Sequence, residues 1–328
     1  MLTGHGDDIR RYKDIRINFS SNVYNHFDHT RLFRHLAESL PHVLNYPEPT
    51  PTTLEERLAQ MLDLQPSEVM VTNGATEAIY LIAQSFSGAS SAILHPTFSE
   101  YQDACRLHHH ILDGNNEDMI WICNPNNPTG LTIDKADLLA IIGENSNTVY
   151  VIDASYSPFT LQPLITPAEA VRLPNILMLH SMTKGFAIPG LRLGYVTACT
   201  TLLDRVRKCR MPWSVNQMAI DAGHYLLSHI DDYRLDIHAL MAERERVASL
   251  LAEIRGIEVF PSDSHILLCR TLHGSSPMLK DYLARHHGIL IRDASNFEGL
   301  DNSYFRIAIQ TPKENDELIN SLRQWTAS

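Results

Sequence analysis

Cysteine, positive charge and long apolar runs are all scarce in this sequence. Its 328 residues include five cysteines, and no two of them are separated by only two residues. An odd number without metal-type spacing argues against a disulfide scaffold and a zinc module, so we expect free thiols in a reducing cytoplasm. No apolar run reaches the ~18 residues of a membrane helix, and the charged N-terminus lacks the apolar core of a signal peptide.

Positive charge falls short of negative charge, with 27 Lys and Arg against 38 Asp and Glu and a formal net charge of -11. A surface of this sign repels phosphate backbones, so we expect neither nucleic acid nor an anionic membrane as a partner. An anionic ligand would need cations placed locally, which makes individual arginines informative. The histidine runs at 108–110 and 286–287 lack a second cluster of ligands at suitable spacing, so no metal site is expected.

Short apolar runs alternate with amphipathic stretches over the first two-thirds of the chain. Most of the runs are β-branched or apolar throughout, as in strands buried on both faces. The alternation predicts a mostly parallel sheet wrapped by helices, the arrangement of an α/β fold. The predicted strands are 68–72, 92–94, 119–123, 148–152, 176–179 and 193–197, and the predicted helices between them are 76–85, 98–107 and 136–142.

The pattern changes near Pro212, after which two helices are predicted over 218–227 and 231–254. Shorter strands and helices follow to the end of the chain, which predicts a smaller α+β unit. We therefore expect an N-terminal segment over 1–27 that joins the small domain, a large domain over 28–211, and linking helices with the small domain over 212–328.

Four motifs lie at the ends of predicted strands. Ligands of open α/β sheets bind at the carboxyl ends of the strands, so the four motifs are candidates for a single site. They are VTNGATEA at 71–78, NPNNPTG at 124–130, VIDASY at 151–156 and HSMTKGFAIPGLRLGY at 180–195.

The side chains in these motifs favour a phosphorylated ring that contains nitrogen. A helix that starts at Gly74 presents backbone N–H groups to an anion, and hydroxyls beside Arg192 suit a phosphate. Lys184 lies among apolar residues, where an amine can lose its proton and form a Schiff base. Asp153 ends an apolar strand and needs a partner such as a protonated ring nitrogen. Each residue alone could be an ordinary turn, surface or capping residue, but together they match the requirements of pyridoxal 5'-phosphate (PLP).

The order and spacing of the motifs resemble the fold-type-I PLP enzymes of the aminotransferase class I/II family, from His5 to Arg306. The resemblance implies PLP transferase fold type I, with a mostly parallel sheet of the seven-stranded type and a smaller α+β domain. It also implies that Lys184 carries the cofactor, that Asp153 pairs with the ring nitrogen, and that Tyr156 is a third catalytic residue. The cofactor contacts that it implies are Gly74, Ala75, Thr76, Phe98, Asn127, Asp153, Tyr156, Ser181, Thr183, Lys184 and Arg192.

The resemblance extends to a second subunit and departs from relatives in one motif. Tyr46 in NYPEP is similar to a tyrosine that reaches the cofactor phosphate of the neighbouring subunit, which implies a homodimer. DASY stands where relatives usually have DEAY or DEAF, so Ala154 replaces an acidic residue and Ser155 a small one. Asp153 and Tyr156 are retained, and the cofactor site is expected to be intact.

Two branches of the family resemble the chain, the L-threonine-O-3-phosphate decarboxylases and the histidinol-phosphate aminotransferases. The stretches GHGDDIR, HPTFSEY, TKGFAIPGLRLGY with the later MPWSVN, and GILIRDASNFEGLDNSYFRIAI favour the decarboxylases. The last stretch holds Arg292 and Arg306, which we expect to lie near each other, because a substrate with a carboxylate and a phosphate needs more than one cation. The substrate contacts that the resemblance implies are His5, Gly6, Asn22, Asn127, Arg292 and Arg306.

The expected function is decarboxylation of a small phosphorylated amino acid, L-threonine O-3-phosphate. Amino transfer from histidinol phosphate to 2-oxoglutarate stays open, because both reactions use the same cofactor motifs and differ in which bond at Cα stands perpendicular to the ring. A third alternative is a non-catalytic PLP-fold module of a transcription regulator. Such chains carry a basic DNA-binding segment before the fold, whereas this chain is acidic and its fold is expected to begin within the first twenty residues.

Overall fold

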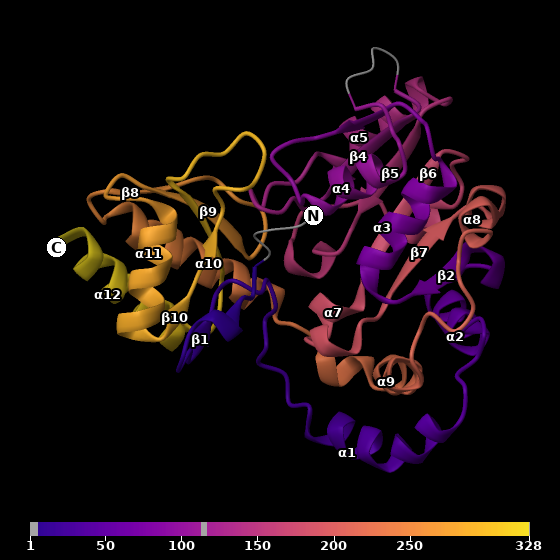
Figure 1. The fold of residues 1–328 in the computed structure, drawn as a ribbon, viewed down its shortest axis with the longest axis horizontal. Coiled ribbons are helices and arrows are strands. Elements are labelled where there is room, and N and C mark those ends of the chain that lie inside the picture. The colour runs from indigo at the N-terminus through magenta and orange to yellow at the C-terminus, as the bar shows by residue number, and fades with distance from the viewer. Residues whose placement is uncertain (1–5, 113–116, 328) are drawn as a thin grey trace.

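The computed structural model describes residues 6–112 and 117–327 (Figure 1). The larger of its sheets has six strands in the order β2-β7-β6-β5-β4-β3. The bounds are β2 Val69–Thr72, β3 Ser91–Ile93, β4 Met119–Cys123, β5 Val149–Asp153, β6 Ile176–Ser181 and β7 Gly194–Ala198. All six predicted strands are therefore present, and each end lies within two residues of its predicted position.

Most strands of this sheet are parallel, as predicted. Strands β3, β4, β5 and β6 run in one direction, and β7 is antiparallel to its neighbours β2 and β6. Six strands and one bridge, between Ser90 and Ile111, stand in the described residues where seven strands were expected. Ile111 is exposed, so a longer strand at this edge would bury little apolar surface.

Helices cover both faces of the sheet, because successive side chains along each strand point to opposite faces. Trp121 and Leu177 pack with α3 and α4 on one face, whereas Ile122 and Met178 pack with α5 and α6 on the other. The helices of this part are α1 Thr30–Ser39, α2 Thr52–Leu62, α3 Gly74–Ser85, α4 Glu100–Leu107, α5 Lys135–Glu144, α6 Pro167–Ala170, α7 Met182–Gly185, α8 Thr200–Arg207 and α9 Gln217–Ser228.

The C-terminal part has a four-stranded antiparallel sheet in the order β11-β12-β9-β8, at the left of Figure 1. The helix predicted over 231–254 is formed only from Ile237 to Ala252. A 3-10 turn at Ile230–Tyr233 is followed by a separate helix, because Asp236 accepts a hydrogen bond from the N–H of Ala239 at 3.0 Å and caps a new start. The elements are α10 Ile237–Ala252, β8 Ile257–Val259, β9 Ile266–Thr271, α11 Ser276–Tyr282, β11 Arg292–Asp293, β12 Tyr304–Ala308 and α12 Pro312–Ala327.

The N-terminal segment crosses to the C-terminal part, where β1 (Ile17–Asn18) pairs in parallel with β10 (Ile289–Leu290). This pairing agrees with an N-terminal segment that joins the small domain, and the division after residues 27 and 211 stays a prediction. No helix in the described ranges is long and apolar enough to cross a membrane. Within the same ranges, no group of three or more His, Cys, Asp or Glu side chains is arranged to hold a metal ion.

The strand registers bring distant motifs to one edge of the large sheet. Cys123 at the end of β4 is level with Asp153 at the end of β5. Gly194 at the start of β7 is level with both Thr72 in β2 and Ser181 in β6. The strands thus bring the four predicted motifs together at one edge of the sheet. A cavity opens at this edge.

Candidate active site

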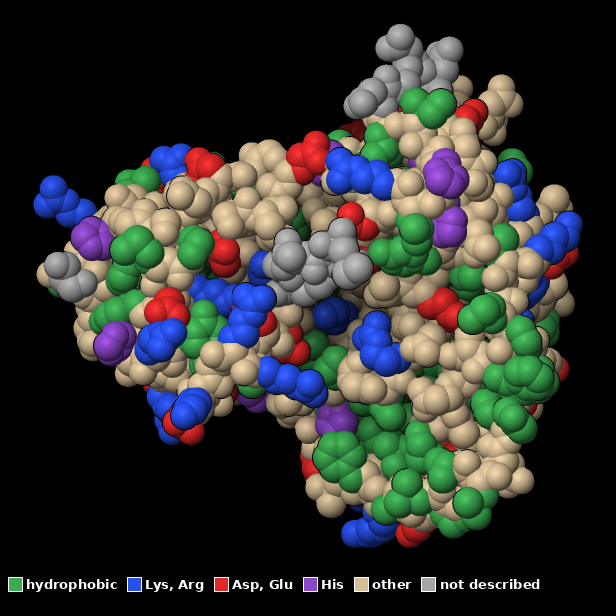
Figure 2. All heavy atoms as spheres, viewed as in Figure 1, with side chains coloured by type: hydrophobic (Ala, Val, Ile, Leu, Met, Phe, Trp, Pro, Cys, Tyr) green, Lys and Arg blue, Asp and Glu red, His purple; other side chains and the backbone are tan. Residues whose placement is uncertain are grey.

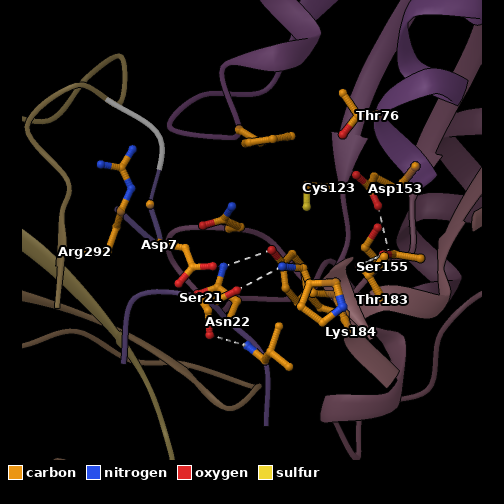
Figure 3. Close-up of a pocket in the computed structure, with 18 of the residues that line it drawn as sticks. Asp7, Ser21, Asn22, Thr76, Cys123, Asp153, Ser155, Thr183, Lys184 and Arg292 are labelled. Carbon is orange, nitrogen blue, oxygen red and sulfur yellow. Dashed lines mark hydrogen bonds between the residues drawn. The ribbon is translucent and has the colours of Figure 1, made fainter. Parts of the chain in front are cut away.

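A cavity of about 400 Å³ lies between the large sheet, the C-terminal sheet and the N-terminal segment (Figure 3). The predicted site residues that line it are Gly6, Asn22, Ala75, Thr76, Phe98, Asn127, Asp153, Tyr156, Ser181, Thr183, Lys184, Arg192, Arg292 and Arg306. Gly74 lies in close contact with the guanidinium of Arg192. Tyr46 is 85% exposed, packs on Trp213 and does not line the cavity of its own subunit. His5 lies outside the described residues.

Lys184 reaches the cavity from α7, the short helix that follows β6. Its Nζ donates a hydrogen bond to the backbone oxygen of Ser21 at 3.0 Å. Burial, reinforced by the positive charges of Arg306 and Arg192, lowers the pKa of Lys184 to about 8. The amine therefore loses its proton more readily than an ordinary lysine and is suited to attack an aldehyde.

The lowered pKa gives a testable pH dependence. Only the neutral amine attacks the aldehyde of PLP, so the rate at which the apoprotein captures PLP is expected to rise with pH and to level off above about 8. The measurement is the growth of visible absorbance after mixing, from about pH 6 to about pH 10. A rate that still rises between pH 9 and pH 10 would mean that Lys184 titrates like a free lysine.

Asp153 ends β5 with its carboxylate buried and held at both oxygens. Oδ1 accepts a hydrogen bond from the N–H of Ser155 at 2.9 Å, and Oδ2 accepts one from the hydroxyl of Tyr101 at 2.6 Å. Burial and the charge of Asp153 raise the pKa of Tyr101, so its hydroxyl keeps the proton that it donates. Tyr101 was missed at the sequence level, although it stands three residues after Phe98 in HPTFSEY.

An anion cradle is formed where β2, β6 and β7 meet. Gly74 has a φ of +74°, and a Cβ there would lie 2.6 Å from Nη2 of Arg192 and displace the guanidinium. A Cβ on Gly194 would lie 2.7 Å from the backbone nitrogen of Ala75, so only glycine lets the start of α3 approach β7. The hydroxyls of Ser181 and Thr183 lie 2.6 Å apart beside this helix start. Backbone N–H groups, hydroxyls and a guanidinium are the donors that a phosphate requires.

Asn22 and Tyr156 meet on the N-terminal side of the cavity. The amide of Asn22 donates a hydrogen bond to the hydroxyl of Tyr156 at 2.9 Å, and Figure 3 shows Asn22 beside Ser21 and near Lys184. Oδ1 of Asn22 is buried and has no hydrogen-bond partner among the described residues. A ligand can therefore still bind to this residue.

Arg306 and Arg292 form the cationic wall of the cavity. They are 3% and 6% exposed and are direct partners across β12 and β11, which confirms that they lie near each other. Arg306 donates hydrogen bonds to Oδ1 of Asn127 and to the oxygen of Ser20, while its buried Nε has no partner in the described part of the chain. Arg292 is held by Oδ1 of Asn296 at 2.7 Å. Burial lowers the pKa of both arginines, which favours an anion that would neutralise them.

Further lining residues were not singled out from the sequence. They come from the N-terminal segment, from α4, from the ends of strands and from the loop after β11, and those that stand in quoted stretches were given no role there. Among them are Asp7, Ser20, Ser21, Tyr101, Cys123, Ser155, Asn296 and Phe297.

The cavity fits PLP in three respects. The cradle beside Arg192 suits the phosphate, and its glycine leaves no room for a side chain. Lys184 has the lowered pKa that a cofactor-carrying lysine needs. Asp153 is a buried carboxylate that lines the same cavity, where a protonated ring nitrogen would balance its charge.

Comparison with known proteins agrees with this fit. The model of the family "Aminotransferase class I and II" matches residues 14–113 and 109–322. A crystal structure of L-threonine-O-3-phosphate decarboxylase from Porphyromonas gingivalis superposes with a TM-score of 0.93 at 37% identity, covering 95% of this chain and all of that one. A threonine-phosphate decarboxylase of Salmonella typhimurium is 29% identical and covers 98% of this chain and 96% of that protein.

Relatives of the other branch are similar to a comparable degree. A histidinol-phosphate aminotransferase of Caldanaerobacter subterraneus subsp. tengcongensis is 31% identical over 306 residues, which cover 86% of this chain and 85% of that protein. Relatives of both branches are similar to this chain over most of its length. This protein is accordingly a member of the aminotransferase class I and II family and an enzyme that uses pyridoxal 5'-phosphate.

Proposed function

We propose that this enzyme decarboxylates L-threonine O-3-phosphate to 1-amino-2-propanol O-2-phosphate and carbon dioxide. The observation that carries the proposal is the pair of buried guanidinium groups of Arg292 and Arg306 on neighbouring strands. Arg192 already stands beside the cofactor cradle, so two further cations match a substrate with two anionic groups. The 37% identity with a decarboxylase of this substrate supports the same choice.

The proposed roles of the side chains follow from their positions. PLP, when bound, supplies an acceptor for the electron pair that carbon dioxide leaves at Cα. Asp153 keeps a proton on the ring nitrogen, and Lys184 returns a proton to Cα from its ε-amine. Arg306 binds the carboxylate and Arg292 the phosphate, which fixes the rotation about the bond between nitrogen and Cα. With PLP bound, Phe98 would pack against the cofactor, and Tyr156 and Asn127 would bind its 3-hydroxyl.

Histidinol-phosphate aminotransferase is the second candidate, favoured by the 31% identity of a relative with that name. Two arginines would also serve its dicarboxylate acceptor, 2-oxoglutarate. Lys184 would then remove the proton from Cα as a base, with the Cα–H bond perpendicular to the ring.

Mixing the holoenzyme with O-phospho-L-threonine in the absence of any keto acid separates the two functions. The decarboxylase releases carbon dioxide over many turnovers and keeps its PLP. An aminotransferase stops after a single conversion of bound PLP to pyridoxamine phosphate and releases no gas. That second result would overturn the proposal, and addition of histidinol phosphate with 2-oxoglutarate would then identify the alternative.

Replacing Arg292 with alanine is expected to raise the KM for O-phospho-L-threonine by about 10²-fold, because a charge-assisted, partly bidentate contact with the phosphate is lost. The PLP content should stay unchanged, since Arg292 lies apart from the cofactor cradle. Arg270→Ala is the matched control, because Arg270 lies on β9 of the same sheet and pairs with Glu258 at the surface. Equal losses of substrate and PLP binding in Arg292→Ala would make the residue structural.

We also propose a homodimer in which Tyr46 of each subunit reaches the cofactor phosphate of the partner. Tyr46 stands outside its own cavity in an exposed apolar region. Figure 2 shows hydrophobic side chains gathered at its lower right, where Figure 1 places α1 and the segments around it. Exposed apolar patches of this kind mark protein interfaces. The exposed residues on α1, on the following turn, on α2 and before α9 are Phe33, Leu40, Val43, Leu44, Met61, Met211 and Trp213.

Subunit mixing tests this arrangement. Tyr46→Ala and Lys184→Ala are each expected to be impaired at limiting PLP, since one lacks the phosphate contact and the other the cofactor lysine. A hybrid dimer has one complete site, made of Lys184 from one subunit and Tyr46 from the other. Equal mixing with subunit exchange should therefore restore about a quarter of the wild-type activity. A mixture no more active than its components would mean that Tyr46 serves no neighbouring site.

A further inference from the structure

Gly6 and Asp7 of the N-terminal segment line the cavity, and Asp8 follows them. The backbone N–H of Asp7 donates a hydrogen bond to Oγ of Ser20 at 3.0 Å, and Figure 3 shows Asp7 beside Ser21. Gly6 packs against Arg292, because a Cβ on Gly6 would lie 3.0 Å from Cδ of that arginine. The segment is thus in contact with the side chain to which we assign the substrate phosphate.

One ion pair ties this segment to the C-terminal part. Both oxygens of Asp8 accept hydrogen bonds from Nζ of Lys280, at 2.7 and 2.8 Å. The side chains are 15% and 9% exposed, far less than those of the neighbouring surface pair, in which Asp281 is 48% and Arg285 65% exposed. Removal of Asp8 would leave the shielded ammonium of Lys280 without this partner, and removal of Lys280 would leave Asp8 only a longer contact, at 3.6 Å, with the exposed Arg11. The pair with Lys280 therefore holds the segment more firmly than an exposed pair would.

Lys280 connects the segment to the strand of Arg292. It lies on α11, and α11 contacts β11, the strand that begins with Arg292. Arg292 is therefore contacted by Gly6 of the N-terminal segment, while its own strand packs on α11. The Asp8–Lys280 pair links the N-terminal segment to α11.

We propose that Asp8 and Lys280 are positioning residues that hold residues 6–8 closed over the cavity, so that Arg292 and the anionic end of the substrate are enclosed together. The assignment of the substrate rests on the proposed function. The enclosure itself concerns any phosphate-bearing ligand at Arg292. The pair touches neither the substrate nor PLP, and it acts by lowering the freedom of the segment that covers them.

The fold offers a way to separate this role from overall stability. The strand pairing of Ile17–Asn18 with Ile289–Leu290 anchors the chain a few residues beyond the segment. Loss of the Asp8–Lys280 pair should therefore release the segment before β1 without unfolding either sheet. Trypsin can report this release, because Arg10 and Arg11 are exposed and lie between residues 6–8 and β1.

The test uses the PLP-loaded enzyme and the near-isosteric variants Asp8→Asn and Lys280→Met. We expect each to raise the dissociation constant of inorganic phosphate, measured by calorimetry, and the KM for O-phospho-L-threonine by about tenfold, with kcat within about twofold of wild type. Trypsin should cleave the segment faster, and the visible absorbance of bound PLP should not change. Lys280→Arg, which retains the ion pair, should restore phosphate binding.

Asp281→Asn is the matched control, since it removes an exposed pair with Arg285 on the same helix. Faster cleavage with unchanged phosphate binding would overturn the proposal, because the segment would then be held for no benefit to the site. Parallel losses of PLP, kcat and thermal stability would also overturn it, since they would make the pair structural. If wild-type enzyme released no carbon dioxide, the proposed function would fail, while phosphate binding and proteolysis would still decide the role of the pair.

Discussion

Lys184→Ala is expected to lower turnover by about 10³-fold or more and to abolish the visible absorbance band of lysine-bound PLP. The structure places this amine in the cavity at the end of β6, with a pKa lowered to about 8 by burial and by the charges of Arg306 and Arg192. The variant loses both the covalent attachment of the cofactor and the proton donor to Cα. Absorbance spectra of the purified protein with added PLP, together with assays of carbon dioxide release, measure the two losses.

Lys208→Ala is the control for this prediction, because Lys208 is exposed at the end of α8 and lies outside the cavity. It should keep the band and the activity of wild type. A Lys184→Ala protein that retained the band would show that another lysine holds PLP. Loss of the band with full turnover would contradict the assigned role in proton transfer.

The edge of the large sheet could be predicted from the sequence because its determinants are local. Apolar runs mark the strands, and in a parallel sheet their carboxyl ends meet at one edge. Asp153, Lys184 and Gly74 each end or follow such a run. Their convergence on one cavity therefore required only strand order, which the family resemblance supplied.

Contacts between distant segments could not be predicted in the same way. Tyr101 donates to Asp153 across 52 residues, and Asp8 pairs with Lys280 across 272. Neither pair has a periodicity or a turn signal, because such contacts depend on packing between elements rather than on local backbone preference. The pairing of Arg292 with Arg306 was predictable, since both stand on adjacent strands of one short hairpin-like stretch.

The interrupted helix before residue 237 illustrates a competition that periodicity does not resolve. Apolar residues continue at helical spacing through 231–254, but Tyr233 is buried against Phe27 and Phe186 in a different cluster from α10. Asp236 then caps a new helix. Burial of one aromatic ring and one side-chain cap together outweigh the continuity of the pattern.

Asp153→Asn is the second change with a large expected effect, a loss of about 10²–10³-fold in turnover with PLP still bound. The amide keeps the shape of the carboxylate, and its single oxygen can still accept the hydrogen bond from the N–H of Ser155. Its nitrogen then faces the hydroxyl of Tyr101, which can turn and accept instead of donating, so the local structure should persist. It lacks the negative charge that keeps a proton on the ring nitrogen, and the electron pair at Cα is then poorly accommodated. Turnover assays and the PLP content after alkaline release are the measurements.

Asp118→Asn is the control for this prediction, because Asp118 is a surface carboxylate just before β4, at the opposite edge of the sheet. This variant should retain wild-type turnover. Full activity of Asp153→Asn would mean that another residue pairs with the ring nitrogen. Loss of PLP from the variant would mean that the main role of Asp153 is to bind the cofactor.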